Sequence, residues 1–312
     1  MRKFIKRHKR FVIFVIAVLA VSAALCIKFL FFSEQPLTNI RAISAGFNHC
    51  LALKNDGTIV GWGDDKYNCI KIPDGNNFIA IAAGWYHSLA LRSDGSVAGW
   101  GNNDNGQATP PVGKNFKAIA AGYMHGIALK SDGSIVGWGL NTGGQARPLY
   151  GNNFVAIAAG YFHGLALKSD GTIVGWGENN YGQARPPDGK NFIAISAGND
   201  HSLALRSGGS IAGWGNNDNG QATPPDGNDF IAISAGYSYS LALKSDGSIA
   251  GWGLNNYGQA TPPAGNNFIA IAAGTYYSLG LKSDGTVVMW GLIPRPMLTW
   301  QLWLWRLRTW TW

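Results

Sequence analysis

The sequence of 312 residues predicts an all-β fold, a seven-bladed β-propeller of 38-residue four-stranded repeats, preceded by one N-terminal hydrophobic helix. Gly and Trp recur at a constant interval of 38 residues through most of the chain. Gly makes up 43 residues, about twice its average share, and charged residues make up 13%, about half of theirs. A chain so poor in Lys and Glu is a weak candidate for a helical bundle.

Residues 1–35 begin with a basic stretch and continue with an apolar run over residues 11–27. This order is typical of a secretory signal peptide or of an uncleaved signal-anchor helix. Small residues at 22–24 would permit cleavage, but a second apolar patch at 29–32 favours retention as an anchor. Basic residues flank the cytoplasmic end of such helices. The rest of the chain is therefore expected outside the cytoplasm, membrane-anchored or, if the segment is cleaved, secreted.

The region 36–291 contains seven units in register, which is the first feature to look for in a repetitive chain. The repeat Gly occurs as Gly46, Gly84, Gly122, Gly160, Gly198, Gly236 and Gly274. The repeat Trp occurs as Trp62, Trp100, Trp138, Trp176, Trp214, Trp252 and Trp290. No insertion interrupts either series, so each unit is expected to have the same structure.

A typical unit, residues 78–111, divides at its turn residues into four short β runs, at 78–83, 88–92, 96–101 and 107–109. Ser-Asp-Gly between the second and third runs predicts a tight hairpin, because Gly accepts the positive φ that such turns require. Four antiparallel strands in about 40 residues are typical of a propeller blade. A solenoid is the alternative, but the tight hairpins favour blades. The Trp of the third run is expected to fill the gap between blades.

The repeated pattern A-G-x-x-H-[SG]-L-A-L-K-S-D-G, followed by G-W-G and G-Q, resembles the regulator of chromosome condensation repeat family. The resemblance covers Ile40 to Gly291 and implies a seven-bladed propeller. The short units are most similar to those of the secreted bacterial type that binds and inhibits a β-lactamase. Gly-Gln is missing from the first unit, which has Asn68 and Cys69, and from the seventh, which has Pro296 and Met297.

The His of this pattern is expected to have a structural role, a hydrogen bond across its blade or to the next one, because it recurs once per unit. It occurs as His49, His87, His125, His163 and His201, and Tyr239 and Tyr277 replace it in the last two units. Five His spaced around a ring are unsuited to a tetrahedral zinc site, and the Asn-rich turns lack the acidic ligands of a calcium loop. We therefore expect no metal and no cofactor. Cys50 and Cys69 could pair in an oxidising compartment or remain unpaired in the core.

The charge of the repeats argues against nucleic-acid binding. Residues 35–291 contain 15 basic and 16 acidic side chains, so the net charge of +8 comes from the two ends of the chain. Nucleic-acid binding requires clustered Lys and Arg. The chain also has no nonrepeating catalytic constellation and no nucleotide-binding loop that opens a helix. The sequence therefore predicts a protein that is not an enzyme.

The two residues after each repeat Gly vary while the frame around them is fixed, and they fall in the turn between the first and second runs. Tyr and Trp there would supply large contact areas to a partner. The turn between the third and fourth runs should open on the same face and add more aromatic, Asn and acidic side chains. The predicted binding residues are Phe47, Trp85, Tyr86, Tyr123, Met124, Tyr161, Phe162, Tyr237 and Tyr276.

These residues predict a loop face that binds a protein or, less favoured, a glycan. The resemblance implies the same role for Trp85, Tyr123, Tyr161 and Phe162. The alternative is that these rings only pack on neighbouring blades. An alternative function, implied by the family's eukaryotic member, is guanine nucleotide exchange on a small GTPase, but the predicted export and the near-neutral repeats oppose it.

Residues 292–312 depart from the repeat and contain five of the 13 Trp residues. Shifted by one or two bases, codons for this segment could encode words of the repeat. The segment is therefore interpreted as an out-of-frame translation of further repeat sequence, and a genuine Trp-rich tail is the alternative. In either case the seventh unit lacks its standard fourth run.

Overall fold

The computed structural model describes residues 37–293, which form seven antiparallel sheets of three strands each. The expected N-terminal helix and the segment 294–312 lie outside these residues. Within the described range, no helix has the length and apolar character needed to cross a membrane. The all-β prediction and the count of seven blades are confirmed.

The seven sheets, called blades 1 to 7, follow one another along the chain with equivalent bounds. Their strands are β1 (Ile40–Ala45), β2 (His49–Lys54) and β3 (Ile59–Gly63); β4 (Phe78–Ala83), β5 (His87–Arg92) and β6 (Val97–Gly101); β7 (Phe116–Ala121), β8 (His125–Lys130) and β9 (Ile135–Gly139); β10 (Phe154–Ala159), β11 (His163–Lys168) and β12 (Ile173–Gly177); β13 (Phe192–Ala197), β14 (His201–Arg206) and β15 (Ile211–Gly215); β16 (Phe230–Ala235), β17 (Tyr239–Lys244) and β18 (Ile249–Gly253); β19 (Phe268–Ala273), β20 (Tyr277–Lys282) and β21 (Val287–Gly291).

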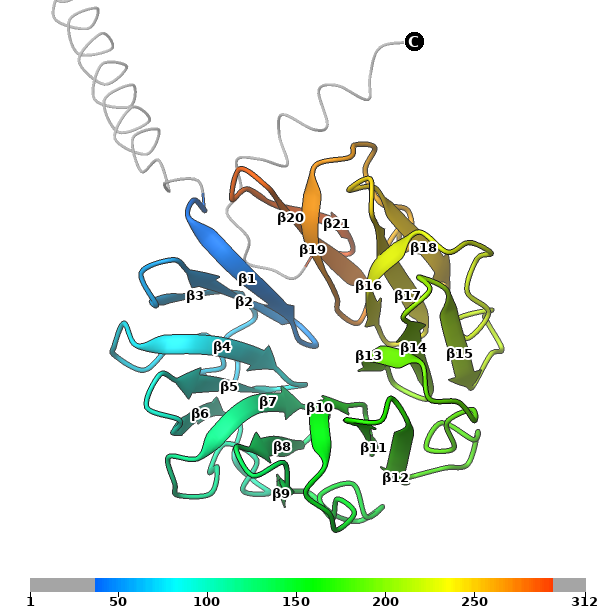
Figure 1. The fold of residues 1–312 in the computed structure, drawn as a ribbon. Coiled ribbons are helices and arrows are strands. Elements are labelled where there is room, and N and C mark those ends of the chain that lie inside the picture. Colours follow the sequence, from blue (N-terminus) through cyan, green and yellow to red (C-terminus); the bar gives the residue numbers. More distant parts are fainter. Residues whose placement is uncertain (1–36, 294–312) are drawn as a thin grey trace, which may run out of the picture. The chain divides into compact units, whose positions relative to one another are not determined.

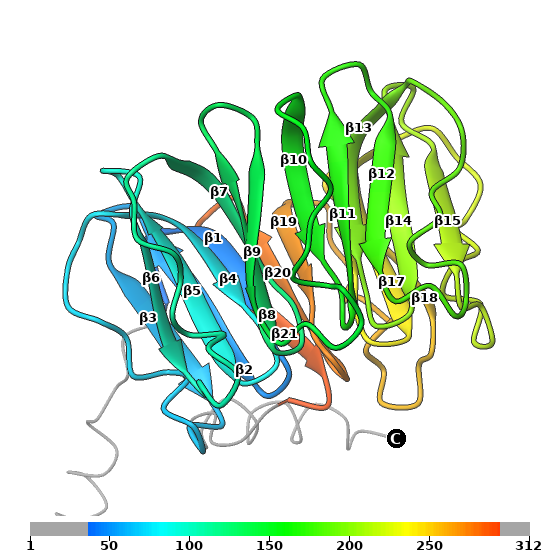
Figure 2. The ribbon, with the colours of Figure 1, turned by 90° about the horizontal axis from the view of Figure 1, so that it is seen from below.

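The first strands of the blades surround a common axis, and the third strands lie at the rim (Figure 1). Viewed from the side, the blades stand next to one another, and their turns gather at the two ends of the strands (Figure 2). Main-chain hydrogen bonds link blades near the axis, as from Trp85 N to Gly122 O at 3.2 Å. A Cβ on Gly84 would lie 2.7 Å from Gly122 O and 2.4 Å from the His87 ring, so this close approach requires Gly.

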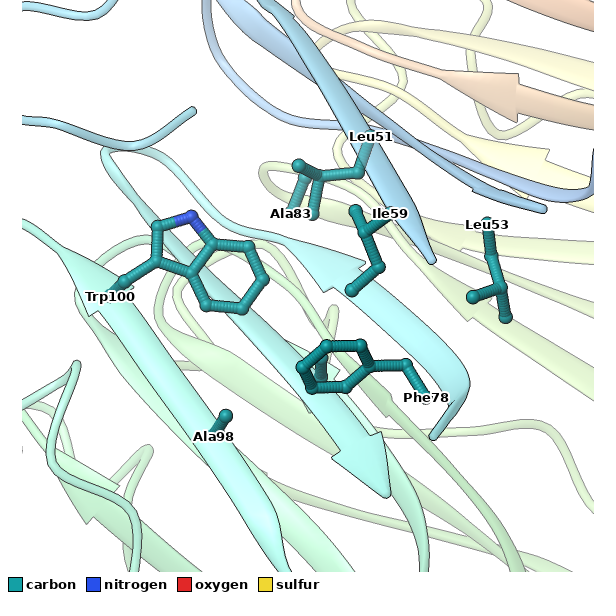
Figure 3. Packing of buried hydrophobic residues seen from close by; sticks show 8 residues of the cluster. Leu51, Leu53, Ile59, Phe78, Ala83, Ala98 and Trp100 are labelled. Carbon is teal, nitrogen blue, oxygen red and sulfur yellow. The ribbon is translucent and has the colours of Figure 1, made fainter. Parts of the chain in front are cut away.

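The hydrophobic core is divided into clusters, and each cluster lies between two adjacent blades and contains side chains from both. Between blades 1 and 2, Leu51, Leu53 and Ile59 pack against Phe78 and Trp100 (Figure 3). All five are buried. Equivalent clusters recur at the five junctions from blade 2 to blade 7, so much of the hydrophobic stabilisation lies between blades.

The Ser-Asp-Gly turns form hairpins, as the sequence predicts. In blade 2, Asp94 Oδ1 accepts hydrogen bonds from Ser96 N at 2.9 Å and Ser96 Oγ at 2.6 Å. Gly95 has φ of +80°, which L-residues rarely adopt. These hydrogen bonds, together with the smaller effect of Lys114, lower the pKa of Asp94 to about 2.

The prediction of a fourth strand is wrong, because the fourth run has no ladder hydrogen bonds with its own blade. In blade 2 the run uses its N–H groups in a local turn. Ala108 N donates to Asn103 Oδ1 at 2.9 Å, and Thr109 N donates to Gly106 O at 3.0 Å. The two prolines that follow have no N–H to offer. The run, called the fourth segment, packs across the central Gly of the third strand, where a Cβ on Gly99 would lie 2.5 Å from Ala108 O.

The ring closes between blades 7 and 1 (Figure 1), where Cys50 and Met289 stand at positions that Ser or Gly occupies in the other blades. The hydroxyl of Tyr277 donates to His49 O at 2.8 Å, and Cys50 Sγ lies 3.4 Å from it. Trp62 Nε1 donates to Met289 Sδ at 3.2 Å. Met289 stands where the six other third strands have Gly. Cys50 is a free thiol, as is Cys69.

Candidate functional site

One end of the ring carries two sets of turns, as the sequence predicts. The first set joins the first and second strands, and the second set follows the third strands. A main-chain hydrogen bond connects the two in each blade, for example from Asn102 N to Tyr86 O at 2.8 Å and from Glu178 N to Phe162 O at 2.9 Å. We call the surface formed by both sets the aromatic face.

Aromatic rings of the first set meet across the axis of the ring. Phe47 stacks on Trp85 with centroids 3.7 Å apart, and Tyr123 stacks on Tyr161 at 4.0 Å. Trp85 joins the two pairs, because its ring lies 5.1 Å from Tyr161. Its centroid is also 6.3 Å from that of Tyr237, which comes from blade 6. These rings form one continuous cluster and not a circle of separate groups.

Further aromatic contacts extend the cluster outward to the second set of turns. Tyr86 lies 4.7 Å from Tyr67, and Tyr276 lies 5.3 Å from Tyr257, centroid to centroid. Met124 Sδ is 3.4 Å from Asn105 Nδ2. The structure therefore brings the nine predicted binding residues together on one face, spread over six blades.

Each of the nine side chains is half-buried and keeps part of its surface in solvent. The rings near the axis pack partly on rings of neighbouring blades, as the alternative interpretation predicts, and still keep exposed surface. Beneath them lies a hollow of about 110 Å³, lined by the Ala-Gly ends of the first strands and by the residue after each repeat Gly. The arrangement is a partly exposed aromatic platform, and the binding role of its residues stays a prediction.

Two polar residues interrupt the platform in blade 5. Asn199 Nδ2 donates a hydrogen bond to Asp200 Oδ2. Burial raises the pKa of the Asp200 carboxyl, and the negative charge of Glu178 raises it further. The charge of Asp200 in turn contributes to the raised pKa values of Tyr161 and Tyr237, whose main cause is also burial. Asp200 therefore lies next to the aromatic cluster and within its low-dielectric surroundings.

The repeat His side chains are buried inside the ring, next to the repeat Gly residues. His163 Nε2 lies 2.9 Å from Ser202 Oγ of the next blade, and that hydroxyl donates to Gln183 O at 2.9 Å. Trp214 Nε1 donates to the same carbonyl at 2.9 Å. The carbonyl of Gln183 in blade 4 thus accepts hydrogen bonds from two side chains of blade 5. His49 and His201 contact Ser in the same way, and Tyr239 does so in blade 6.

His87 and His125 have no such partner, because Gly126 and Gly164 stand at the equivalent Ser positions. Both of their ring nitrogens lack a hydrogen bond among the described residues. The adjacent Trp fills the space instead, since a Cβ on Gly126 would lie 2.3 Å from the Trp138 ring. Burial lowers the pKa of His125 to about 4 and that of His87 to about 3.

The repeat Trp residues connect blades, which extends the predicted gap-filling role. Six of them donate from Nε1 to a carbonyl of the preceding blade's fourth segment, at 2.8 to 2.9 Å. The seventh, Trp62, donates from Nε1 to Met289 Sδ. No group of three or more His, Cys, Asp and Glu side chains within residues 37–293 could hold a metal ion.

The repeat Gln, to which the sequence pattern alone assigns no role, is structural. Gln107 and its equivalents are buried. Gln107 Oε1 accepts a hydrogen bond from Asn105 N at 2.9 Å, which fixes the turn at the aromatic face. Its main-chain carbonyl accepts the Trp138 indole. The recurrence of Gly-Gln in five units was the available signal.

Fold and repeat together define the protein as a seven-bladed propeller made of one repeating β unit. The regulator of chromosome condensation (RCC1) repeat matches residues 40–69, 78–107, 116–145, 154–183, 192–221 and 230–259. These six stretches make up more than half of the chain, so the chain belongs to the RCC1 repeat family. The match ends before blade 7, the blade that departs from the pattern at Met289.

Solved structures with similar folds include the ectodomain of the Physcomitrella patens receptor kinase CR4, with a TM-score of 0.70 and 22% identity over 82% of this chain and 74% of that one. The ectodomain of the Arabidopsis thaliana receptor kinase ACR4 has a TM-score of 0.69 and 22% identity, over 82% of this chain and 98% of that one. Prp20p from Saccharomyces cerevisiae, whose structure is described with its binding to Gsp1p and histones, has a TM-score of 0.65 and 19% identity, over 86% of this chain and 85% of that one. No curated protein matches the chain.

Proposed function

We propose that this chain is a non-enzymatic, protein-binding propeller that holds its partner on the aromatic face. The observation that carries the proposal is the continuous cluster around Trp85, Tyr161 and Tyr237, which is built from the positions that vary between blades. Positions that recur, such as the His and Trp of each unit, serve the junctions between blades.

The physical properties of this cluster favour a protein partner. Half-buried Tyr and Trp rings are already fixed by mutual stacking, so little conformational entropy is lost when they bind. Aromatic side chains are also the residues most often found to dominate interface energetics. The likeness to Prp20p, a structure described as binding Gsp1p and histones, agrees with protein binding in general. A glycan is the less favoured ligand.

The proposal includes export, with the propeller outside the cytoplasm and the chain anchored by residues 1–35 or secreted. Its support is the order of the basic stretch and the apolar run in the sequence. Cell fractionation with protease treatment of intact cells tests this. The repeats should be digested from outside in the anchored case, and resistance of a cytoplasmic pool would contradict export.

The binding proposal is tested by recovering partners from an extracytoplasmic extract with the wild-type protein and with the double variant Trp85→Ala/Tyr161→Ala. The double variant is expected to lose the partner, because it removes both stacked pairs of the cluster. The matched control is Val112→Ala/Tyr150→Ala, which truncates two fully exposed side chains of the loops that precede first strands. If all three proteins recover the partner equally and have the same melting temperature, the proposal that the aromatic face binds the partner is wrong.

The alternative function, nucleotide exchange on a small GTPase, stays a prediction from the family resemblance. At 19% identity, the likeness to Prp20p supports a similar fold and does not support a shared activity. Release of a fluorescent guanine nucleotide from a small GTPase, measured with and without the chain, tests it. Acceleration of release would favour regulation over the proposal above.

A further inference from the structure

The aromatic face is strongly acidic, although the repeats as a whole are nearly neutral. Its turns contain six acidic side chains and one basic side chain, Lys66. The other residues of the described range contain 14 basic and 10 acidic side chains. The acidic residues of the face are Asp64, Asp65, Asp104, Glu178, Asp200 and Asp218. A face with net charge −5 favours partners that present positive charge.

Two of these carboxylates lie beside the aromatic cluster in blade 5 and the turn next to it. Asp200 follows Asn199, whose side chain takes an aromatic position beside the axis and lines the hollow. Glu178 begins the turn beside it and is close enough to raise the pKa of the Asp200 carboxyl. Asp200 is also close enough to act on the pKa values of Tyr161 and Tyr237. A half-buried carboxylate flanked by Tyr rings is a favourable setting for an ammonium or guanidinium group.

A hydrogen-bond acceptor at the same place lacks a donor. Asn199 donates its amide N–H to Asp200, which leaves Asn199 Oδ1 buried and without a partner among the described residues. A buried carbonyl oxygen without a donor costs free energy. Lys and Arg side chains offer several N–H groups, so one of them could satisfy this oxygen and the Asp200 carboxylate together.

We propose that the aromatic face takes a basic segment of its protein partner, with a Lys or Arg side chain bound at Asn199 and Asp200 against the rings of Tyr161 and Tyr237. This inference rests on the proposed function of the face and specifies the chemistry of its partner. The apolar stem of the Lys or Arg lies along the rings, and its charged end reaches the carboxylate. The remaining carboxylates of the face attract the segment during encounter.

The experiment selects binders from a library of random 12-residue peptides displayed on phage, using the full chain. Peptides recovered on the wild type and lost on Trp85→Ala/Tyr161→Ala are expected to be enriched in Lys and Arg. Synthetic copies of these peptides are then measured against Glu178→Gln/Asp200→Asn, which removes two charges and keeps the side-chain shapes. We expect binding to weaken about tenfold or more, because charge-assisted hydrogen bonds are lost.

The matched control is Asp188→Asn/Asp226→Asn, which removes two charges from exposed positions in the loops before β13 and β16. Its affinity should stay within about twofold of the wild type, since screening weakens exposed distant charges. The single variant Glu178→Gln is a second test if the double variant melts early. Replacing the Lys or Arg of a selected peptide by norleucine should weaken binding as much as the charge variant does.

The outcomes separate the two proposals. Peptides that need Trp85 and Tyr161, but lack Lys and Arg and bind Glu178→Gln/Asp200→Asn normally, would overturn the inference and leave the binding face intact. Recovery of no peptide that depends on Trp85 and Tyr161 would overturn both. Enrichment of basic residues with equal weakening by the Asp188→Asn/Asp226→Asn control would also overturn the inference, because the attraction would then be nonspecific.

Discussion

At the scale of single residues, the junctions between blades depend on a small polar network that repeats with local exceptions. The complete form joins a His, a Ser, a Trp and the carbonyl of a buried Gln, as between blades 4 and 5. The reduced form at His87 and His125 lacks the Ser hydroxyl. Since buried polar groups are costly when unpaired, the complete junctions should be the more stable ones.

Ser202→Ala is expected to lower the free energy of unfolding by about 1 to 3 kcal/mol, because it leaves His163 Nε2 buried without a partner. Urea unfolding followed by Trp fluorescence measures the loss. Ser93→Ala is the control, since Ser93 is exposed and its hydroxyl has no hydrogen bond among the described residues. A loss below about 0.5 kcal/mol, the usual size of a surface substitution, would show that this hydrogen bond is dispensable.

Acid should destabilise the ring through its five buried His residues. Burial lowers the pKa of each from 6.5 to about 3 or about 4. The unfolded chain therefore binds more protons than the native one between about pH 4 and 6.5, and stability rises with pH over that window. Each His contributes about 2 kcal/mol at pH 7 that is lost by pH 5.

The urea midpoint should accordingly fall steeply from pH 7 to pH 5, before most carboxylates titrate. Proton NMR of the native imidazoles provides the check, because their resonances should not titrate in this range. Native imidazole resonances of these five residues that titrate near pH 6.5 would contradict the burial effect.

At the scale of elements, each blade is a three-stranded sheet plus a fourth segment held by packing and turn hydrogen bonds. The segment lies directly over the central Gly of the third strand. Its carbonyl then anchors the next blade's Trp. A change at the central Gly should therefore affect two blades, although it introduces only one methyl group.

Gly175→Ala tests this coupling. The added Cβ would lie 2.3 Å from Ala184 O, a backbone atom that cannot move without displacing the segment. We expect a loss of about 2 kcal/mol or more and faster proteolysis after Arg185, measured by mass spectrometry of a limited tryptic digest. Gly208→Ala is the control, because nothing lies within 4 Å of its Cβ. Similar stability of both variants would mean that the segment is not held at this Gly.

At the scale of the whole molecule, the ring has six similar junctions and one special one. Contacts near the axis close it through Tyr277 and Cys50, and contacts at the rim close it through Trp62 and Met289. Burial raises the pKa of the Cys50 thiol to about 12, which keeps this thiol protonated and unreactive at neutral pH. The closure therefore depends on packing and not on a covalent bond.

Met289→Ala should open the closing junction in preference to the others, because it removes the acceptor of the Trp62 indole and the side chain that fills the gap. Because Met289 is only half-buried, we expect a loss of about 2 kcal/mol, the low end of the cost of truncating a core Met. Hydrogen exchange measured by mass spectrometry should show reduced protection in β1–β3 and β19–β21. Val112→Ala, at a fully exposed position, is the control. Evenly reduced protection over all blades would contradict a local closure.

Most of the fold could be predicted from the sequence, because the repeat in register determines three strands, the hairpin and the order of blades. The fourth strand could not, since Ala108 and Thr109 satisfy their N–H groups through the Asn103 side chain and a turn. The difference lies in hydrogen bonds that periodicity does not reveal.

The location of the aromatic face could also be predicted, because strand direction places both sets of turns at one end. The contact of Trp85 with Tyr161 and Tyr237 across the axis could not, since it depends on how narrow the ring is. The sequence shows M-W-G at residues 289–291 in place of G-W-G. The contact of Met289 at the closing junction could not be predicted from this, because the sequence does not show that the fourth segment packs on the equivalent Gly.

The side chain at residue 289 also makes the closing junction chemically unlike the six others. At each of those six, a fourth-segment carbonyl accepts the indole N–H of the following Trp. At the closing junction the indole of Trp62 meets the sulfur of Met289. A thioether is a weaker acceptor than a carbonyl oxygen, so the joint between the first and last blades is the place where the circle is held together least tightly.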